Sequence, residues 1–208
     1  MSSHFRLATV VLVLTCSPVL GAQQRMAPIP ADKMTDAQKK AAAEFAEART
    51  PDIRGPWVPF LRSPELMSRV RATSDYLRFN STLSPKLVEL VVLITARHWT
   101  QNYEWNAHHP AALKEGLDPQ IASSIAEGRR PVRMADDEAI IYDLITEVLK
   151  SQDVSDATYA KAVARFGEKG VIDAVCLSGH YTLISMVLNT ARVALPANTK
   201  PALAPLSR

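Results

Sequence analysis

The chain has 208 residues, of which 47% are hydrophobic, and 24 Lys and Arg against 21 Asp and Glu give a formal net charge of +3. This length predicts a single domain with a substantial core, and the weak charge, without basic clusters, argues against a nucleic-acid partner. Only seven residues are glycine, and helix-forming residues are frequent, so the composition favours an all-α fold.

The first 22 residues have the pattern of a secretory signal peptide. Residues 1–6 carry one positive charge, residues 7–20 form an uncharged and mostly apolar run, and two small residues follow. The run is shorter than the roughly 20 residues that span a bilayer. We therefore expect a secreted or periplasmic protein with no membrane contact after signal removal. Lipidation at Cys16 is the weaker alternative, because Thr15 is larger than the residue that usually precedes a lipidated cysteine.

Removal of this segment leaves Cys176 as the one cysteine of the mature chain. One cysteine forms neither an internal disulfide nor a Cys-x-x-Cys redox pair, even in an oxidising compartment. We expect Cys176 to be a buried small hydrophobic residue, and His180 on the same segment to be a satisfied core or interface histidine.

The N-terminal part of the mature chain predicts little core structure. Residues 23–34 are polar and contain proline, which is typical of a flexible linker. A peripheral helix is expected over residues 35–49, because it has few large apolar side chains. Residues 51–62 contain too many prolines for a helix and predict an ordered loop held by its aromatic residues, among them Trp57.

Serine–proline pairs predict the next two helix starts. Ser63-Pro64 begins a helix that runs to about Phe79, and Ser84-Pro85 begins the most apolar segment of the chain. Because the helical spacing of its side chains continues, we expect this second helix to run without a break through residue 108.

The C-terminal half predicts further helices. Asp118-Pro119 starts a short helix that ends at Gly128, and longer helices are expected over residues 136–150, 155–166 and 168–194, with Gly167 between the last two. The helical domain therefore spans residues 35–196, and the tail over residues 197–208 is expected to be loose.

Four polar side chains share one face of the expected helix. Their spacings of 4, 3 and 4 residues place them in a stripe about 60° wide: Arg97, Gln101, Glu104 and His108. Glu104 can orient or charge the imidazole of His108, the side chain best suited to proton transfer near neutral pH. A solvated ion pair is the alternative, but the neighbouring Trp105 indicates a cleft or a subunit contact. Pro110 predicts a kink or a break close by.

The stretch Glu104-Trp105-Asn106-Ala107-His108 resembles the Tyr-Glu-Trp-x-x-His motif of carboxymuconolactone decarboxylase-like proteins. The resemblance covers about residues 55–196 and includes residues 62–66, 87–99, 111–117, 136–149 and 154–159, Gly179-His180-Tyr181 and Asn189. It implies an alkylhydroperoxidase D-like helical bundle that forms homo-oligomers with sites near the subunit contacts.

In the alkylhydroperoxidase D type of this superfamily, a Cys-x-x-Cys pair lies on the same helix, with a histidine four residues after the second cysteine. Gln101 and Glu104 hold those two positions here, so the dithiol peroxidase mechanism does not carry over. His108 matches the histidine, and Glu89 matches the acid that assists it. On an unbroken helix Glu89 would lie about 22 Å from Glu104, so it reaches the site only if the chain bends or a partner subunit supplies it.

The resemblance implies a carboxy-lyase of the 4-carboxymuconolactone decarboxylase type, which acts on a small carboxylated lactone or keto acid. His108, Glu104 and Glu89 would be catalytic, with His108 as the general acid. Arg97 either binds a substrate carboxylate or pairs with Glu104, and the sequence leaves both open. The other candidate substrate-binding residues are Gln101, Trp105 and Trp57.

No cofactor and no metal is expected, because His108 and its neighbour His109 point about 100° apart on a helix and make a poor chelate. Two other functions stay open. One is a peroxidase-like oxidoreductase that depends on an external thiol or cofactor, and the other is a non-catalytic oligomeric protein that binds small molecules in an apolar cleft. Because aromatic-acid breakdown is usually intracellular, export favours a pathway other than that of the family's namesake.

Overall fold

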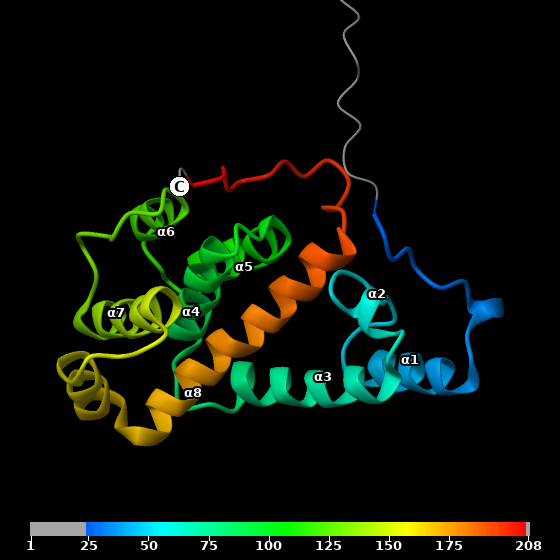
Figure 1. The fold of residues 1–208 in the computed structure, drawn as a ribbon, viewed down its shortest axis with the longest axis horizontal. Helices are drawn as coiled ribbons and strands as arrows, with labels where there is room; N and C mark the ends of the chain where they lie inside the picture. Colours follow the sequence, from blue (N-terminus) through cyan, green and yellow to red (C-terminus); the bar gives the residue numbers. More distant parts are fainter. Residues whose placement is uncertain (1–23, 207–208) are drawn as a thin grey trace, which may run out of the picture.

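The computed structural model describes residues 24–206, so the expected signal peptide and Cys16 lie outside the described residues. Every regular element within this range is helical, which confirms the all-α fold (Figure 1). The elements are η1 Ala31–Lys33, α1 Asp36–Ala48, α2 Trp57–Phe60, α3 Pro64–Phe79, α4 Pro85–His98, α5 Asn102–Lys114, α6 Pro119–Ala126, α7 Asp136–Ser151 and α8 Asp156–Ala191.

Helix α4 lies at the centre of the larger of two apolar cores. Leu90, Val91, Val92 and Leu93 have no exposed surface, because α4 packs against α5, α7 and α8 on different sides. Its start follows the local signal: Pro85 occupies the first turn and the Ser84 hydroxyl accepts from the Leu87 N–H. An apolar surface on all sides suits a helix that is enclosed in this way.

A second core joins α1, α2 and α3 to the C-terminal part of α8, which runs between the two groups of helices (Figure 1). Helix α1 contributes little to the core, as expected: its buried residues are Ala41 and Phe45, and Phe45 packs against Trp57 with ring centroids 5.3 Å apart. Trp57 itself begins the short helix α2, where a loop was expected. The proposed linker also makes contacts, as the Arg25 N–H donates to the Ala191 carbonyl at 2.8 Å.

The unbroken helix expected through residue 108 is wrong, because the chain turns between α4 and α5. Thr100 adopts a left-handed conformation (φ 48°), and the Gln101 side chain then caps α5 by accepting from the Tyr103 N–H at 2.8 Å. Such a residue ends a helix because the backbone leaves the right-handed region. Helix α5 continues through Pro110, so the break precedes the proline.

Helix α8 consists of two segments separated at Gly167 (φ 68°), where the sequence predicts a division. It is the one described helix that is long and apolar enough to cross a membrane, but 56% of its apolar window is buried within the fold, as in the core helix of a globular protein. Cys176 lies on the exposed face of this helix. The expectation of a buried thiol is therefore wrong.

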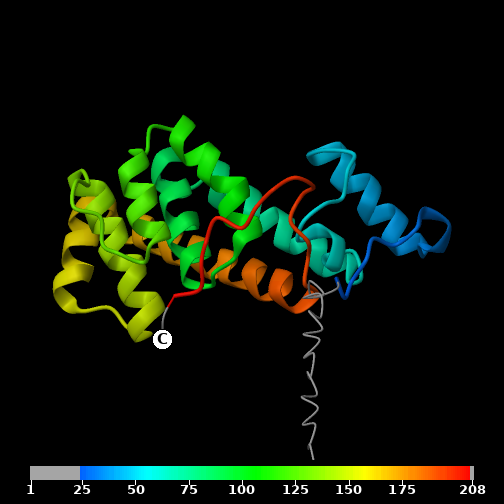
Figure 2. The ribbon, with the colours of Figure 1, turned by 90° about the horizontal axis from the view of Figure 1, so that it is seen from above.

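Most of the C-terminal tail over residues 197–206 is exposed, but it is held at several points and is not loose as expected. It returns across α5 (Figure 2), where the Leu203 N–H donates to Asn102 Oδ1 at 2.8 Å and the Leu203 side chain is only 3% exposed. Arg97 also donates to the Ala204 carbonyl at 2.9 Å. One buried apolar side chain and these hydrogen bonds hold the tail in place.

Candidate acid–base site

His108 and Glu89 meet because the chain turns between α4 and α5. His108 Nδ1 lies 2.6 Å from Glu89 Oε2, and both side chains are buried. This is the distance of a charge-assisted hydrogen bond. One subunit therefore brings Glu89 to the histidine by itself, and no partner is needed to supply it.

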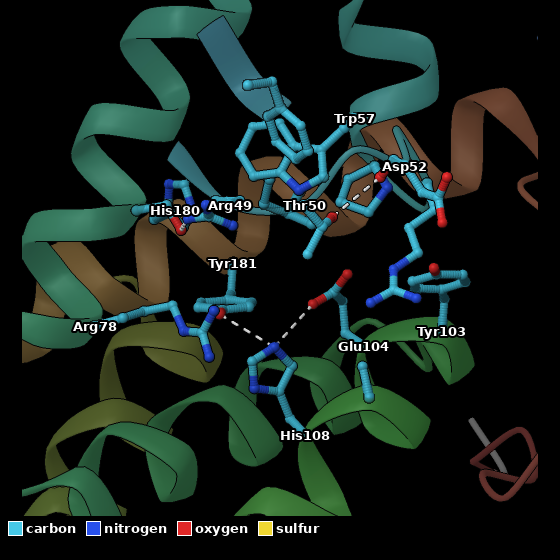
Figure 3. A pocket seen from close by; sticks show the side chains of 16 residues that line it. Arg49, Thr50, Asp52, Trp57, Arg78, Tyr103, Glu104, His108, His180 and Tyr181 are labelled. Carbon is cyan, nitrogen blue, oxygen red and sulfur yellow. Dashed lines mark hydrogen bonds and ion pairs between the residues drawn. The ribbon is translucent and has the colours of Figure 1, made fainter. Parts of the chain in front are cut away.

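The other ring nitrogen of His108 faces two further groups. Nε2 lies 3.1 Å from the Tyr181 hydroxyl and 3.4 Å from Glu104 Oε2 (Figure 3). Glu104 comes from the preceding turn of α5, whereas Tyr181 comes from α8 and stands edge-on to the imidazole, with ring planes at 87°. Three helices thus hold both nitrogens of one imidazole.

The two carboxylates set the charge of His108. Burial alone would lower its pKa, but the hydrogen bonds and negative charges of Glu104 and Glu89 outweigh burial and raise the pKa to about 9. Burial raises the pKa of the Tyr181 hydroxyl far above its ordinary value. At neutral pH the site therefore contains an imidazolium between two carboxylates and a phenol that keeps its proton.

We call the cluster of His108, Glu89, Glu104 and Tyr181 the acid–base wall. It forms part of the lining of a cavity of about 250 Å³. Arginines dominate the other charged groups that line it: Arg49, Arg54 and Arg78, against the carboxylates of Asp52 and Glu104. Its apolar lining includes Trp57, Phe45 and Ile184. The volume fits a small molecule and the charges favour an anionic one.

His180 lines the same cavity from α8 and differs from His108 in charge. Burial and the positive charges of Arg49 and Arg78 lower its pKa to about 4. It is therefore neutral at pH 7. The sequence-based view of His180 as a plain core or interface histidine misses this position in the cavity.

The structure brings together His108, Glu104, Glu89 and Trp57 of the residues singled out in the sequence, but not Arg97. The Arg97 guanidinium donates to the carbonyls of Ala126 and Ala204 and to the Thr100 hydroxyl, and it does not line the cavity. The helix-face argument fails because the turn at Thr100 rotates α5 away from the end of α4.

Gln101 and Trp105 also lie outside the cavity. The Gln101 amide donates to Asn189 Oδ1 at 2.8 Å, and Trp105 is buried in the larger core, where its ring stacks on His109 with centroids 5.7 Å apart. Both pack around the site but do not line the cavity.

Sequence reasoning missed Tyr181 and Arg78 as site residues. Tyr181 was noted only within the family resemblance, and Arg78 stands at the end of a helix with no motif around it. Both reach the site through packing of α3 and α8 against α4, a long-range arrangement without a local signal. A buried tyrosine in an otherwise apolar helix is the one clue, because its hydroxyl needs a polar partner.

Among residues 24–206, no group of three or more histidine, cysteine, aspartate or glutamate side chains is arranged to hold a metal ion. Cys176 does not line the cavity either. The functional groups that the cavity does present are an imidazolium, carboxylates, a phenol and guanidinium groups, which are suited to moving protons and binding anions.

No protein-family model and no curated protein matches the chain in sequence. Solved structures resemble it at low identity. A peroxidase-related protein from Ralstonia eutropha JMP134, described as an alkylhydroperoxidase AhpD core, superposes with a TM-score of 0.69 at 16% identity and covers 84% of this chain and 93% of its own. A peroxidase-related protein from Silicibacter sp. TM1040 also reaches 0.69 at 16% identity, covering 87% and 96%.

A third structure, a protein of unknown function from Agrobacterium tumefaciens with a suggested role as antioxidant defence protein AhpD, has a TM-score of 0.56 at 17% identity. It covers 67% of this chain and 96% of its own. At such identities a structural likeness establishes architecture and not activity. The chain has the alkylhydroperoxidase D-like helical fold.

Proposed function

We propose that this protein is an acid–base enzyme that decarboxylates, or carries out a related lyase step on, a small carboxylated lactone or keto acid. The observation that carries the proposal is the placement of His108 between Glu89 and Glu104 at the wall of a cavity rich in arginine. Its pKa of about 9 keeps the imidazole protonated at neutral pH, so His108 is supplied with the proton that a lyase of this kind must deliver.

In the proposed reaction the substrate loses one carboxylate as CO₂ and gains one proton. The bond between the substrate carbon and its carboxylate breaks, CO₂ leaves, and the electron pair stays on the substrate as an enolate. The Tyr181 hydroxyl then gives its proton to the carbon and takes the Nε2 proton of His108 in exchange, and Glu89 and Glu104 stabilise the imidazolium beforehand. Water returns a proton to His108 after the product leaves.

Tyr181 has a second part in this proposal. When His108 is protonated, its Nε2–H donates to the Tyr181 oxygen across 3.1 Å, so the hydroxyl proton of Tyr181 is free to point into the cavity. A phenol with a raised pKa is a neutral donor, suited to hydrogen-bond the developing enolate oxygen.

Peroxide chemistry is the second candidate, and it is favoured by the names of two structural neighbours, which are called peroxidase-related. Against it, Cys176 is exposed on α8 outside the cavity, and Gln101 and Glu104 stand where the dithiol type has cysteines. A thiol mechanism needs a thiolate at the site. Peroxide consumption that survives Cys176→Ser would favour an oxidoreductase without a thiol.

The test uses the mature protein and a panel of carboxylated lactones and keto acids, with CO₂ release as the measurement. His108→Gln should lower turnover by about 100-fold or more, since general acid catalysis contributes on that order. Glu104→Gln should lower it less. His109→Gln is the matched control on the same helix and should leave turnover unchanged. Equal turnover in the His108 and His109 variants would rule the mechanism out.

We also propose that the enzyme acts outside the cytoplasm as a homo-oligomer, on the basis of the signal-like residues 1–22 and the family resemblance. The mass of the protein recovered from the periplasm or medium should lack these residues, and light scattering should give more than one subunit. A full-length cytoplasmic monomer would contradict both statements.

A further inference from the structure

Arg78 is a partly buried arginine of the cavity lining that donates no hydrogen bond to any of the residues that the structure describes. Its Nε is buried without a partner, and its nearest carboxylate oxygen is Glu89 Oε1, at 3.7 Å from Nη2. The side chain is 24% exposed and lines the cavity, with its guanidinium group directed toward Tyr181 and His108 (Figure 3). A charge that is partly desolvated and weakly paired is stabilised by a further anion.

Arg49 and Arg54 differ from Arg78, each for its own reason. Arg49 and Arg78 each lie over an aromatic ring, Trp57 and Phe79 respectively, but Arg49 also donates from Nε and Nη2 to Asp75 and Ser74, so these donors are already used. Arg54 is exposed at the cavity mouth, where water screens its charge. Arg78 is therefore the arginine whose donors are both inside the cavity and available.

We propose that Arg78 is the binding residue for the substrate's carboxylate, in place of Arg97, and that Arg54 attracts a second carboxylate at the mouth. The ligand class is a small dicarboxylate or an acid of similar size. This inference rests on the proposed function only for the reaction that follows binding. Because Arg78 stands beside the Glu89–His108 pair, a carboxylate held there lies next to the proton donor.

The charges around Arg78 also indicate how the cavity would orient a substrate carboxylate. Glu89 contacts one end of the Arg78 guanidinium at a long distance, which leaves the rest of its donor fork for a ligand. The negative charges of Glu104 and Asp52 would repel a carboxylate from their side of the cavity. A substrate carboxylate is thus directed toward Arg78 and away from the carboxylates.

Succinate, with acetate as the monocarboxylate comparison, is the probe for a direct binding experiment by isothermal titration calorimetry. Arg78→Gln should weaken succinate binding about tenfold or more, because a charge-assisted bidentate contact is lost. Arg78→Lys should fall between this variant and the unchanged protein. Arg69→Gln, on the exposed face of the same helix, is the control and should bind succinate unchanged. Wild-type affinity in the Arg78→Gln variant, or no binding to the unchanged protein, would overturn the proposal.

A second readout needs no variant. The positive charges of Arg49 and Arg78 help to lower the pKa of His180 to about 4, and an anion on Arg78 offsets one of them. Saturating succinate should therefore raise the pKa of His180, followed by NMR of its imidazole, whereas an unchanged value would place the anion elsewhere. Binding with these properties but no CO₂ release from any panel substrate would refute the lyase and leave the carboxylate site standing.

Discussion

Two parts of the cavity lining differ in how their polar groups are satisfied. On the acid–base wall, His108 has protein partners at both ring nitrogens, from α4, α5 and α8. Beside the wall, Arg78 of α3 has no hydrogen-bond acceptor in the described part of the chain, and His180 is kept neutral by burial and by the positive charges of Arg49 and Arg78. The polar groups of the acid–base wall are therefore already satisfied within the protein, whereas Arg78 gains hydrogen-bond acceptors when an anion binds.

The acid–base wall is suited to proton transfer, whereas Arg78 is suited to binding an anion. A proton donor must keep its charge and its position between turnovers, which two carboxylates and a phenol provide for His108. A binding residue contributes most when its free state is poorly paired, because the ligand then supplies hydrogen bonds that the protein lacks. Removing groups from the two parts of the lining should accordingly have different effects on stability and on binding.

The largest effect is expected for Glu89→Ala on the acid–base wall. It leaves His108 buried with a weakened charge partner, and breaking a buried pair of this kind costs about 3–5 kcal/mol. Chemical denaturation measures the free energy of unfolding. Glu65→Ala removes an exposed i,i+4 partner on α3 and should cost less than about 0.5 kcal/mol. Similar losses in the two variants would mean that the wall is not a stabilising network.

The two histidines should give opposite pH dependences, each worth up to about 3 kcal/mol. His108 has its folded pKa raised to about 9, so its contribution is complete below the unfolded pKa of about 6.5 and is lost as pH rises through 9. His180 has its folded pKa lowered to about 4, so stability falls as pH drops from about 6.5 toward 4.

Unfolding free energy should therefore be greatest near pH 6–7. His108→Gln should flatten the alkaline side of the profile and His180→Gln the acidic side. If His108→Gln left the alkaline limb unchanged and His180→Gln left the acidic limb unchanged, the two histidines would not differ in charge as described.

Arg97 offers a sharper comparison with Arg78, because its Nε is also buried without a partner but its Nη1 and Nη2 both donate to protein acceptors. Arg97→Lys keeps the charge, but its single nitrogen cannot replace both Nη1, which donates to the Ala126 and Ala204 carbonyls, and Nη2, which donates to Thr100, so unfolding should become easier by about 1–2 kcal/mol. Succinate binding, measured as for the Arg78 variants, should not change. Weaker binding with unaltered stability would restore the sequence-based role of Arg97.

The smallest effect concerns the turn between α4 and α5 that lets His108 meet Glu89. Thr100 is β-branched and has φ 48°, and its hydroxyl accepts from Arg97. Asparagine tolerates this conformation better and keeps an acceptor. Thr100→Asn should stabilise by up to about 1 kcal/mol, a rise in melting temperature of about 2–4 °C. A lower melting temperature would mean that the threonine methyl group contributes more than the backbone strain costs.

The sequence predicts those features of the fold that depend on local signals. Ser63-Pro64, Ser84-Pro85 and Asp118-Pro119 each mark a helix start within a residue of its observed position, and Gly167 marks the division of α8. Thr100 could not be predicted as a turn, because it is neither glycine nor proline and tertiary packing imposes its conformation.

As with the fold, only the part of the site that depends on local spacing was predictable. His108 and Glu104 are neighbours on one helix and could be paired from their spacing. The positions of Glu89 and Arg78 depend on how α4, α5 and α3 pack, and the partner of Arg97 is a tail whose only packing signal is the apolar residue Leu203. A spacing argument holds only while the helix continues.

The charge of His108 is the central claim, and ¹⁵N NMR of its imidazole measures it directly. At pH 7.5 in the mature protein, both ring nitrogens should carry a proton, with a titration midpoint near 9. In Glu89→Gln the midpoint should fall, because one of the two stabilising charges is gone. A His108 ring that has one unprotonated nitrogen at pH 7.5 and titrates at or below about 6.5 would contradict the account.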